Sequence, residues 1–197
     1  ETSNSAEART LLIRTYPKNR ATRVPEPDAP SSTATGFLVS SDGLILTCAH
    51  AVRDAERISV RLSNGLQFEA AIHRLSTATD LALLKIDYFT RDFLRLGLAE
   101  TVGAGDEVYT VGFPTTEILG LEPKYADGAV SSLSGLKGDA TFFQVTVPVQ
   151  PGNSGGPLVS KDTGRVIGVI TSTAAVESFY RATGTLPQNV NWAVKAE

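Results

Sequence analysis

The stretch Pro148-Val-Gln-Pro-Gly-Asn-Ser-Gly-Gly-Pro-Leu158 holds one serine, Ser154, within a run of glycines and prolines. Glycine adopts positive φ and lets the backbone approach a ligand closely, so such a run can turn neighbouring N–H groups toward one point. A serine hydroxyl beside two such donors provides a nucleophile and an oxyanion site, the minimum for acyl transfer. The run by itself is equally compatible with a tight glycine-rich hairpin between two strands. The chemistry therefore depends on a base and an orienting acid elsewhere in the chain.

A histidine and an aspartate precede this serine, each beside a strand-like segment. His50 ends the segment Gly43-Leu-Ile-Leu-Thr-Cys-Ala-His50, and Asp80 lies in Thr79-Asp-Leu-Ala-Leu-Leu-Lys-Ile86. The order His, Asp, Ser is one of the three known orders of the Ser-His-Asp triad. In such a triad the serine attacks a carbonyl, the histidine transfers the proton and the aspartate orients the imidazole. His50, Asp80 and Ser154 are therefore the predicted catalytic residues.

Three motifs in this order resemble the trypsin-like serine peptidases, and most closely their bacterial HtrA/Deg-type branch. The matching pieces are Thr47-Cys-Ala-His50, Thr79-Asp-Leu-Ala-Leu83 and Pro151-Gly-Asn-Ser-Gly-Gly156. The resemblance covers roughly residues 33–195. It implies an all-β fold of two six-stranded antiparallel β-barrels, with the active site in the cleft between them.

The pattern along the chain agrees with an all-β fold, because short apolar segments alternate with Gly, Pro, Asn and Asp turns and no long helical periodicity appears. Strands are expected at residues 10–16, 34–40, 44–48, 57–62, 67–74 and 81–86, and then at 107–114, 129–133, 141–149, 157–160, 166–172 and 189–195. A short helical turn is expected at residues 51–56. Residues 1–32 form an N-terminal extension with the first strand and a proline-rich loop. The N-terminal barrel spans residues 10–100 and the C-terminal barrel residues 101–197, together forming one peptidase domain.

The resemblance also assigns residues beyond the triad. The backbone N–H groups of Gly152 and Ser154 are expected to form the oxyanion hole. Thr171 is expected to hydrogen-bond the catalytic aspartate. The substrate-binding residues implied by the resemblance are Val149, Ile170, Thr171, Ser172, Thr173 and Trp192, of which Thr171, Ser172 and Thr173 would pair with extended substrate.

The expected P1 preference is for a small or medium apolar side chain. Val149 and Ile170 would lie near the P1 pocket, with Trp192 closing it. Residues 147–151 contain no carboxylate, so a basic P1 residue would lack a partner. The long segment 174–188 lies beside this pocket and is expected to gate it.

Asn153 replaces the aspartate that precedes the nucleophile in digestive trypsins. An amide forms no ion pair with a newly cleaved amino terminus, so activation by insertion of a terminus is not expected. Without such an ion pair, two conformations of residues 150–153 are expected to differ by a few kcal/mol, as in bistable switches. The favoured function is a serine endopeptidase acting on extended or unfolded polypeptide. The alternative is a latent, triad-bearing domain that binds peptide or a partner while its oxyanion loop is disordered.

Composition limits the remaining alternatives. The net charge is −3 and the basic residues are scattered, which argues against nucleic acid as a partner. No apolar run is long enough to span a membrane. Cys48 is the single cysteine, so no internal disulfide forms, and its strand context favours a buried small apolar role over that of a nucleophile.

No cofactor and no metal are expected, and His73 has no acid or cysteine at ligand spacing. The resemblance suggests a periplasmic or secreted bacterial protein. It is compatible with a homo-oligomer and with further domains in the parent protein.

Overall fold

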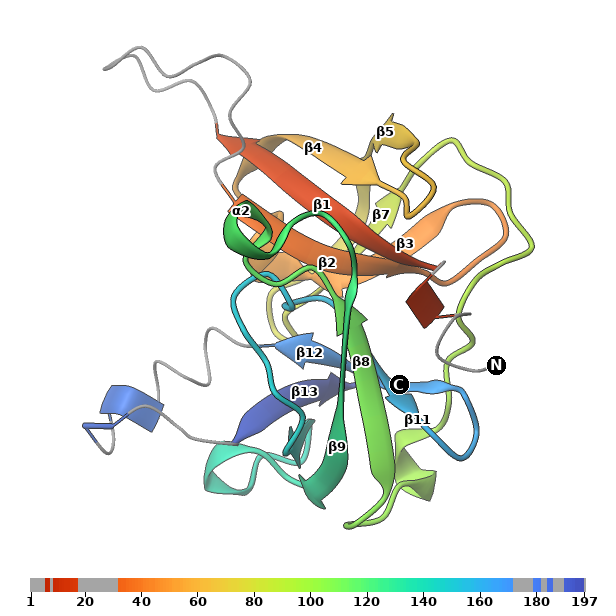
Figure 1. Cartoon of the computed structure of the whole chain (residues 1–197). Helices are drawn as coiled ribbons and strands as arrows, with labels where there is room; N and C mark the ends of the chain where they lie inside the picture. The colour runs from red at the N-terminus through yellow and green to blue at the C-terminus, as the bar shows by residue number, and fades with distance from the viewer. Residues whose placement is uncertain are drawn as a thin grey trace.

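Two antiparallel β-sheets, one from each half of the chain, account for most of the architecture (Figure 1). This computed structural model describes residues 6–7, 9–17, 32–171, 179–181, 184–185 and 190–196. The expected all-β fold is confirmed. No helix among the described residues has the length and apolar character needed to cross a membrane.

The first sheet has seven strands in the spatial order β5-β4-β1-β2-β3-β7-β6. Their bounds are β1 Thr10–Pro17, β2 Ser32–Leu38, β3 Leu44–Cys48, β4 Ala55–Arg61, β5 Gln67–Glu69, β6 Ala71–Ser76 and β7 Leu81–Lys85. Buried side chains alternate along β3 and β7, and these side chains fill the centre of the curled sheet.

The first sheet differs in two respects from the expected six-stranded barrel: it is a curled half-barrel sheet rather than a closed barrel, and it has seven strands because the segment 67–74 divides at Ala70. Ala70 is buried, and its N–H donates to the Ile58 carbonyl at 2.9 Å. Before this corner the chain pairs with β4, and after it the chain pairs with β7. The two ends of the sheet, β5 and β6, are thus halves of one bent stretch.

The second sheet is a closed barrel in the order β10-β13-β12-β11-β8-β9. Its strands are β8 Glu107–Gly112, β9 Lys124–Ser132, β10 Phe142–Val145, β11 Pro157–Ser160, β12 Val166–Thr171 and β13 Asn191–Lys195. Phe143, Leu158 and Ile170 are among the buried residues inside it. Every residue of β12 is buried, because one face of this strand lines the barrel and the other faces the first sheet.

The short helices connect these strands. Among them are η1 Ala49–Ala51, η2 Ala99–Thr101, α2 Thr116–Leu119 and η3 Leu136–Gly138. The turn expected at residues 51–56 is wrong in its bounds, since η1 begins two residues earlier and β4 already begins at Ala55. The sequence did not predict α2, because four residues are too few to produce a helical period.

A third apolar cluster joins the two halves. Phe37 and Cys48 from the first sheet meet Val111, Val159 and Val169 from the barrel, all of them buried. This contact places the end of β3 against β12. The predicted catalytic residues of both halves lie along this junction.

Candidate active site

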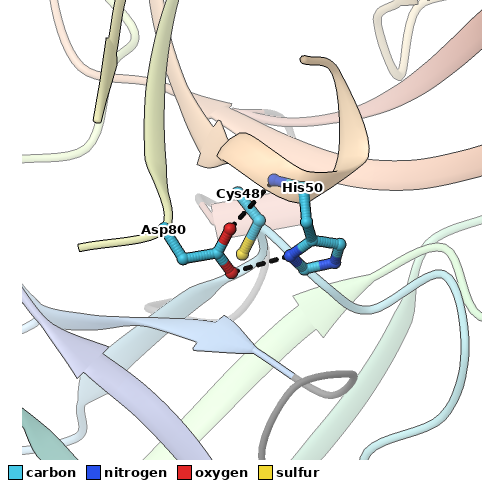
Figure 2. Close-up of side chains that lie close together, drawn as sticks. All are labelled: Cys48, His50 and Asp80. Atoms are coloured by element: carbon cyan, nitrogen blue, oxygen red, sulfur yellow. Dashed lines mark hydrogen bonds and ion pairs between the residues drawn. The ribbon is translucent and has the colours of Figure 1, made fainter. Parts of the chain in front are cut away.

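His50 and Asp80 meet where β3 and β7 end beside each other. Cys48 pairs with Leu81 in the β3–β7 ladder, so η1 and the turn before β7 are neighbours. The Ala49 N–H donates to the Asp80 carbonyl at 2.9 Å. The Asp80 carboxylate binds His50 twice, through Oδ1 to the backbone N–H at 2.9 Å and through Oδ2 to Nδ1 at 2.7 Å (Figure 2). Asp80 therefore fixes both the position and the orientation of the imidazole.

Asp80 has an unusual backbone conformation, with φ of 53°. This left-handed region is sparsely populated by residues other than glycine, although Asp and Asn tolerate it better than most. The hydrogen bonds to Ala49 and His50 hold the strained turn in place. Residues held in such conformations cluster at functional sites.

Burial opposes ionisation of Asp80, but hydrogen bonds from the side chain and backbone of His50 and from Thr171 outweigh it, so the pKa of the carboxyl lies below its usual value. Thr171 belongs to β12 of the second barrel, and its Oγ1 donates to Asp80 Oδ2 at 3.3 Å. The predicted contact between this hydroxyl and the aspartate is present in the structure. The carboxylate is therefore ionised at neutral pH and held by residues from both halves.

Cys48 lies next to this pair, and its sulfur, His50 and Asp80 have ligand-type atoms within 4.8 Å of one another (Figure 2). The thiol is 0% exposed and donates to the Ile170 carbonyl at 3.3 Å. Burial and the nearby Asp80 charge raise the pKa of Cys48. A neutral, enclosed thiol is a poor nucleophile and a poor metal ligand, since both roles require the thiolate.

Ser154 lies in the turn that enters β11, and it is 6% exposed. Its carbonyl accepts a hydrogen bond from the Thr35 N–H of β2 at 2.9 Å. The next residue, Gly155, donates its N–H to Ile170 at 2.8 Å, and a Cβ atom there would overlap Thr35 and Thr47. Because its φ is 86°, only glycine suits this position. The residue after Ser154 thus lies against the end of β3, at Cys48, which precedes His50 by two residues.

Residues 150–153, called the oxyanion loop below, are ordered by hydrogen bonds at three points. The Asn153 N–H donates to the Gln150 carbonyl at 3.0 Å, and the Thr115 N–H donates to the Pro151 carbonyl at 2.9 Å. Thr35 Oγ1 donates to the Gly152 carbonyl at 2.7 Å. Within the described part of the chain, the Gly152 N–H donates to no group, which leaves it available for an oxyanion.

A groove of about 240 Å³ borders the oxyanion loop. It is lined by Ser32, Thr33, Thr115, Thr116, Glu117, Pro151 and Gly152. The groove therefore lies between the start of β2 and the N-terminal end of α2, beside the expected oxyanion hole.

The predicted specificity residues occupy different places. Val149 is partly buried against the barrel core that contains Ile170, so these two side chains share one cluster. Trp192 pairs with Thr171 across β12 and β13, and its ring is 6.2 Å from that of Phe179. Trp192 is only 2% exposed. Ser172 and Thr173 lie outside the described residues, as does most of the segment 174–188.

Sequence reasoning did not single out Thr35 or Thr115, which hold the oxyanion loop. Thr35 and Gly152 are separated by 117 positions along the chain. A threonine within a β-strand carries no local signal of such a contact. The contact between Thr35 and Gly152 forms only where the two halves of the chain pack against each other.

Known proteins match this chain over most of its length. Residues 34–169 match the family described as the trypsin-like peptidase domain. The chain is 40% identical over 152 residues to serine protease HTR4 of Rattus norvegicus, covering 73% of this chain and 30% of that protein. It is 35% identical over 164 residues to a probable periplasmic serine endoprotease, DegP-like, of Pseudomonas fluorescens, covering 82% of this chain and 33% of the other.

A solved structure shares the fold. The serine endoprotease from Yersinia pestis superposes with a TM-score of 0.74 at 27% identity, covering 98% of this chain and 61% of that one. The chain is also 37% identical over 171 residues to the uncharacterised protein y4bJ of Sinorhizobium fredii, covering 87% of this chain and 27% of that protein. The chain thus spans about a third or less of the length of these curated relatives.

Proposed function

Because the chain belongs to the trypsin-like peptidase family, we propose that it is a serine endopeptidase with Ser154, His50 and Asp80 as its catalytic triad. The observation that carries this proposal is the paired contact of the ionised Asp80 carboxylate with the His50 backbone and Nδ1. This contact leaves the other ring nitrogen, Nε2, to exchange a proton with a nucleophile.

The proposed reaction is acyl transfer through the triad. Ser154 Oγ forms a bond to the carbonyl carbon of the scissile peptide while its proton passes to His50 Nε2. The carbonyl oxygen becomes an oxyanion that the N–H groups of Gly152 and Ser154 bind. His50 then protonates the leaving amine, the C–N bond breaks, and an acyl enzyme remains. Water repeats the sequence and releases the acid.

Extended or unfolded polypeptide is the substrate class that this site favours. The end of β12 at Thr171 offers backbone groups for an added strand, and the family resemblance extends this expected pairing to Ser172 and Thr173, which lie outside the described residues. The apolar P1 environment is assigned to Val149, Ile170 and Trp192 by the family resemblance, and Val149 and Ile170 share one apolar cluster of the barrel. An apolar pocket separates substrates that differ by one methylene by only about 1–3 kcal/mol, so the preference is broad. The relatives named as periplasmic endoproteases support a periplasmic location.

The latent alternative requires a disordered oxyanion loop. Against it stand the hydrogen bonds from Thr35 and Thr115 to consecutive carbonyls of that loop. An unengaged Gly152 N–H among the described groups also favours a formed oxyanion site.

A fluorophosphonate probe tests the proposal, since it labels only an activated serine. Wild-type protein should label, Ser154→Ala should not, and Cys48→Ala should label at a rate close to wild type. Labelling of Ser154→Ala, or none of the wild type under conditions in which it is folded, would reject the assignment. Loss of labelling in Cys48→Ala with the fold intact would mean that the thiol is needed to keep the serine activated.

A further inference from the structure

The geometry points to Thr35 as a positioning residue for the oxyanion loop: its hydroxyl, on β2, binds the Gly152 carbonyl and so fixes the peptide group that adjoins the Gly152 N–H in the second barrel. This inference rests on the proposed function, because it assigns that N–H to the oxyanion. Thr35 touches neither substrate nor reacting atoms in this proposal and acts through Gly152.

Thr35 is 0% exposed, and all of its polar groups form hydrogen bonds. Its N–H donates to the Ser154 carbonyl at 2.9 Å and its Oγ1 donates to the Gly152 carbonyl at 2.7 Å. The same Oγ1 accepts from the Phe113 N–H at 3.0 Å, and the Thr35 carbonyl accepts from Thr47 Oγ1 at 2.7 Å. Thr35 thus binds the nucleophile segment, the oxyanion loop and the end of β8 at once.

The hydroxyl direction is determined by these partners. A threonine hydroxyl has a single O–H donor, with lone pairs left to accept. Because the Phe113 N–H occupies one lone pair, the proton of Oγ1 is directed to the Gly152 carbonyl. Valine has nearly the same shape but offers neither the donor nor the acceptor.

Two peptide groups meet at Gly152, and hydrogen bonds fix the orientation of both. All peptide bonds of the described chain are trans, so N–H and C=O of each group point in opposite directions. In the group that joins residues 152 and 153, the carbonyl binds Thr35 and the N–H binds Gln150. In the preceding group the Pro151 carbonyl binds the Thr115 N–H, so the Gly152 N–H points the opposite way.

Gly152 is the residue at which this arrangement can change. Its φ is 98°, a conformation that glycine adopts readily and other residues resist. A Cβ atom at this position would also overlap the Phe113 carbonyl. The peptide planes on either side of a glycine rotate with little steric resistance, so hydrogen bonds must fix them. Loss of the Thr35 hydroxyl leaves the Gly152 carbonyl and the Phe113 N–H buried without this partner, which favours rotation of the loop.

The substitution Thr35→Val removes the hydroxyl and keeps the side-chain volume. Removing one oxyanion donor typically lowers kcat by about 10²–10³, and misdirecting it should lower kcat by about 10- to 100-fold. KM should stay within about threefold, because ground-state binding does not use the oxyanion donor. Thr35→Ser, which retains the hydroxyl, should restore kcat to within about threefold of wild type.

A matched control is Thr10→Val on the neighbouring strand β1. Thr10 is also 0% exposed, and its Oγ1 donates to the Ala6 carbonyl at 2.8 Å, remote in sequence from the oxyanion loop. The substitution Thr10→Val therefore removes one buried hydrogen bond from the same sheet. A merely structural role of Thr35 predicts a loss of stability in both variants, larger in Thr35→Val because it removes two hydrogen bonds, and an unchanged kcat in both.

The experiment measures kcat and KM on an apolar-P1 peptide, the affinity of a peptide boronate, and the amide resonance of Gly152 in ¹⁵N-labelled protein. Thr35→Val should lose boronate affinity and kcat by the same factor and should shift the Gly152 resonance, whereas Thr10→Val should do neither.

Wild-type kcat and an unmoved Gly152 resonance in Thr35→Val would overturn the inference while leaving the endopeptidase intact. A wild type without peptidase activity would overturn the proposed function, and the resonance would still test Thr35. If Thr35→Val does not fold, Thr35→Cys, a weaker donor of similar size, should give an intermediate shift and kcat, and wild-type values would overturn the inference.

Discussion

The Thr171 hydroxyl of the second barrel donates to Asp80 Oδ2 of the first sheet at 3.3 Å. The same oxygen binds His50 Nδ1 at 2.7 Å, so one carboxylate oxygen links the base to both halves of the molecule. The orientation of the imidazole therefore depends on how β12 and β7 are placed relative to each other.

Thr171→Val should lower kcat by about 2- to 10-fold, because a typical hydrogen bond contributes about 0.5–1.5 kcal/mol. Asp80 keeps both of its bonds to His50 in this variant, so the triad still assembles. Steady-state kinetics on a peptide substrate measure the loss. A decrease of 10³-fold or more would mean that Thr171 positions the catalytic base by itself.

Asp80→Asn should keep the fold and lower kcat by about 10⁴-fold near neutral pH, because an amide favours the wrong tautomer of the imidazole. Asparagine also tolerates the left-handed backbone found at this position. Asp87→Asn is the control, since Asp87 follows β7 and is exposed. Near wild-type turnover in Asp80→Asn would transfer the orienting role to another acid.

Acid stability gives a separate test of the Asp80 contacts. The folded-state pKa of Asp80 is depressed, so its stabilising contribution is present above the unfolded pKa of about 3.9 and is lost as pH falls through the folded pKa. In urea unfolding, wild type should exceed Asp80→Asn in stability by a constant amount above about pH 5. This difference should shrink below about pH 4. A difference independent of pH would show that the contacts with His50 do not stabilise the ionised carboxylate.

Cys48 should not react with a thiol reagent while the protein is folded. Its thiol is 0% exposed, and burial raises its pKa. We expect one thiol to react with a colorimetric disulfide reagent after denaturation and none beforehand. Fast reaction of the native protein would place an accessible thiolate next to His50 and would favour Cys48 as the nucleophile.

The sequence predicts the strands well because their burial patterns are local. The β3 and β7 segments alternate with period two, and turns that end at Gly43 and Asp80 precede them. The corner at Ala70 is not local, since it arises when one stretch changes partner from β4 to β7. A sequence pattern specifies which face is buried but not the strand on which it packs.

The same distinction applies to the site. The motifs around His50 and Asp80 predict a pair that the structure places at 2.7 Å. The sequence expectation for the oxyanion loop rested on the absence of an ion pair at Asn153. It did not include the hydrogen bonds from Thr35 and Thr115, because both partners come from distant segments. Contacts between a side chain and a distant backbone carbonyl leave no trace in residue spacing.

Asn153, the residue before the nucleophile, supports the last prediction. It is 5% exposed, and its side chain lies so close to Gly112 that a Cβ atom there would be 2.5 Å from Asn153 Oδ1. Oδ1 has no hydrogen-bond partner within the described part of the chain. Asn153→Asp would thus place a carboxylate in an enclosed position without a described cation to pair with it.

A buried, unpaired carboxylate is destabilising in its charged form, so its folded-state pKa should rise above the unfolded value of about 3.9. The sign follows from linkage: Asn153→Asp should nearly match wild-type stability below about pH 4 and lose stability as pH rises from there to the raised folded pKa. Urea unfolding at several pH values measures this trend, with the exposed substitution Asn64→Asp, in the turn between β4 and β5, as the control. Equal stability of Asn153→Asp and wild type at pH 8 would mean that a cationic group reaches residue 153, and activation by an ion pair would again be a workable mechanism for this protein.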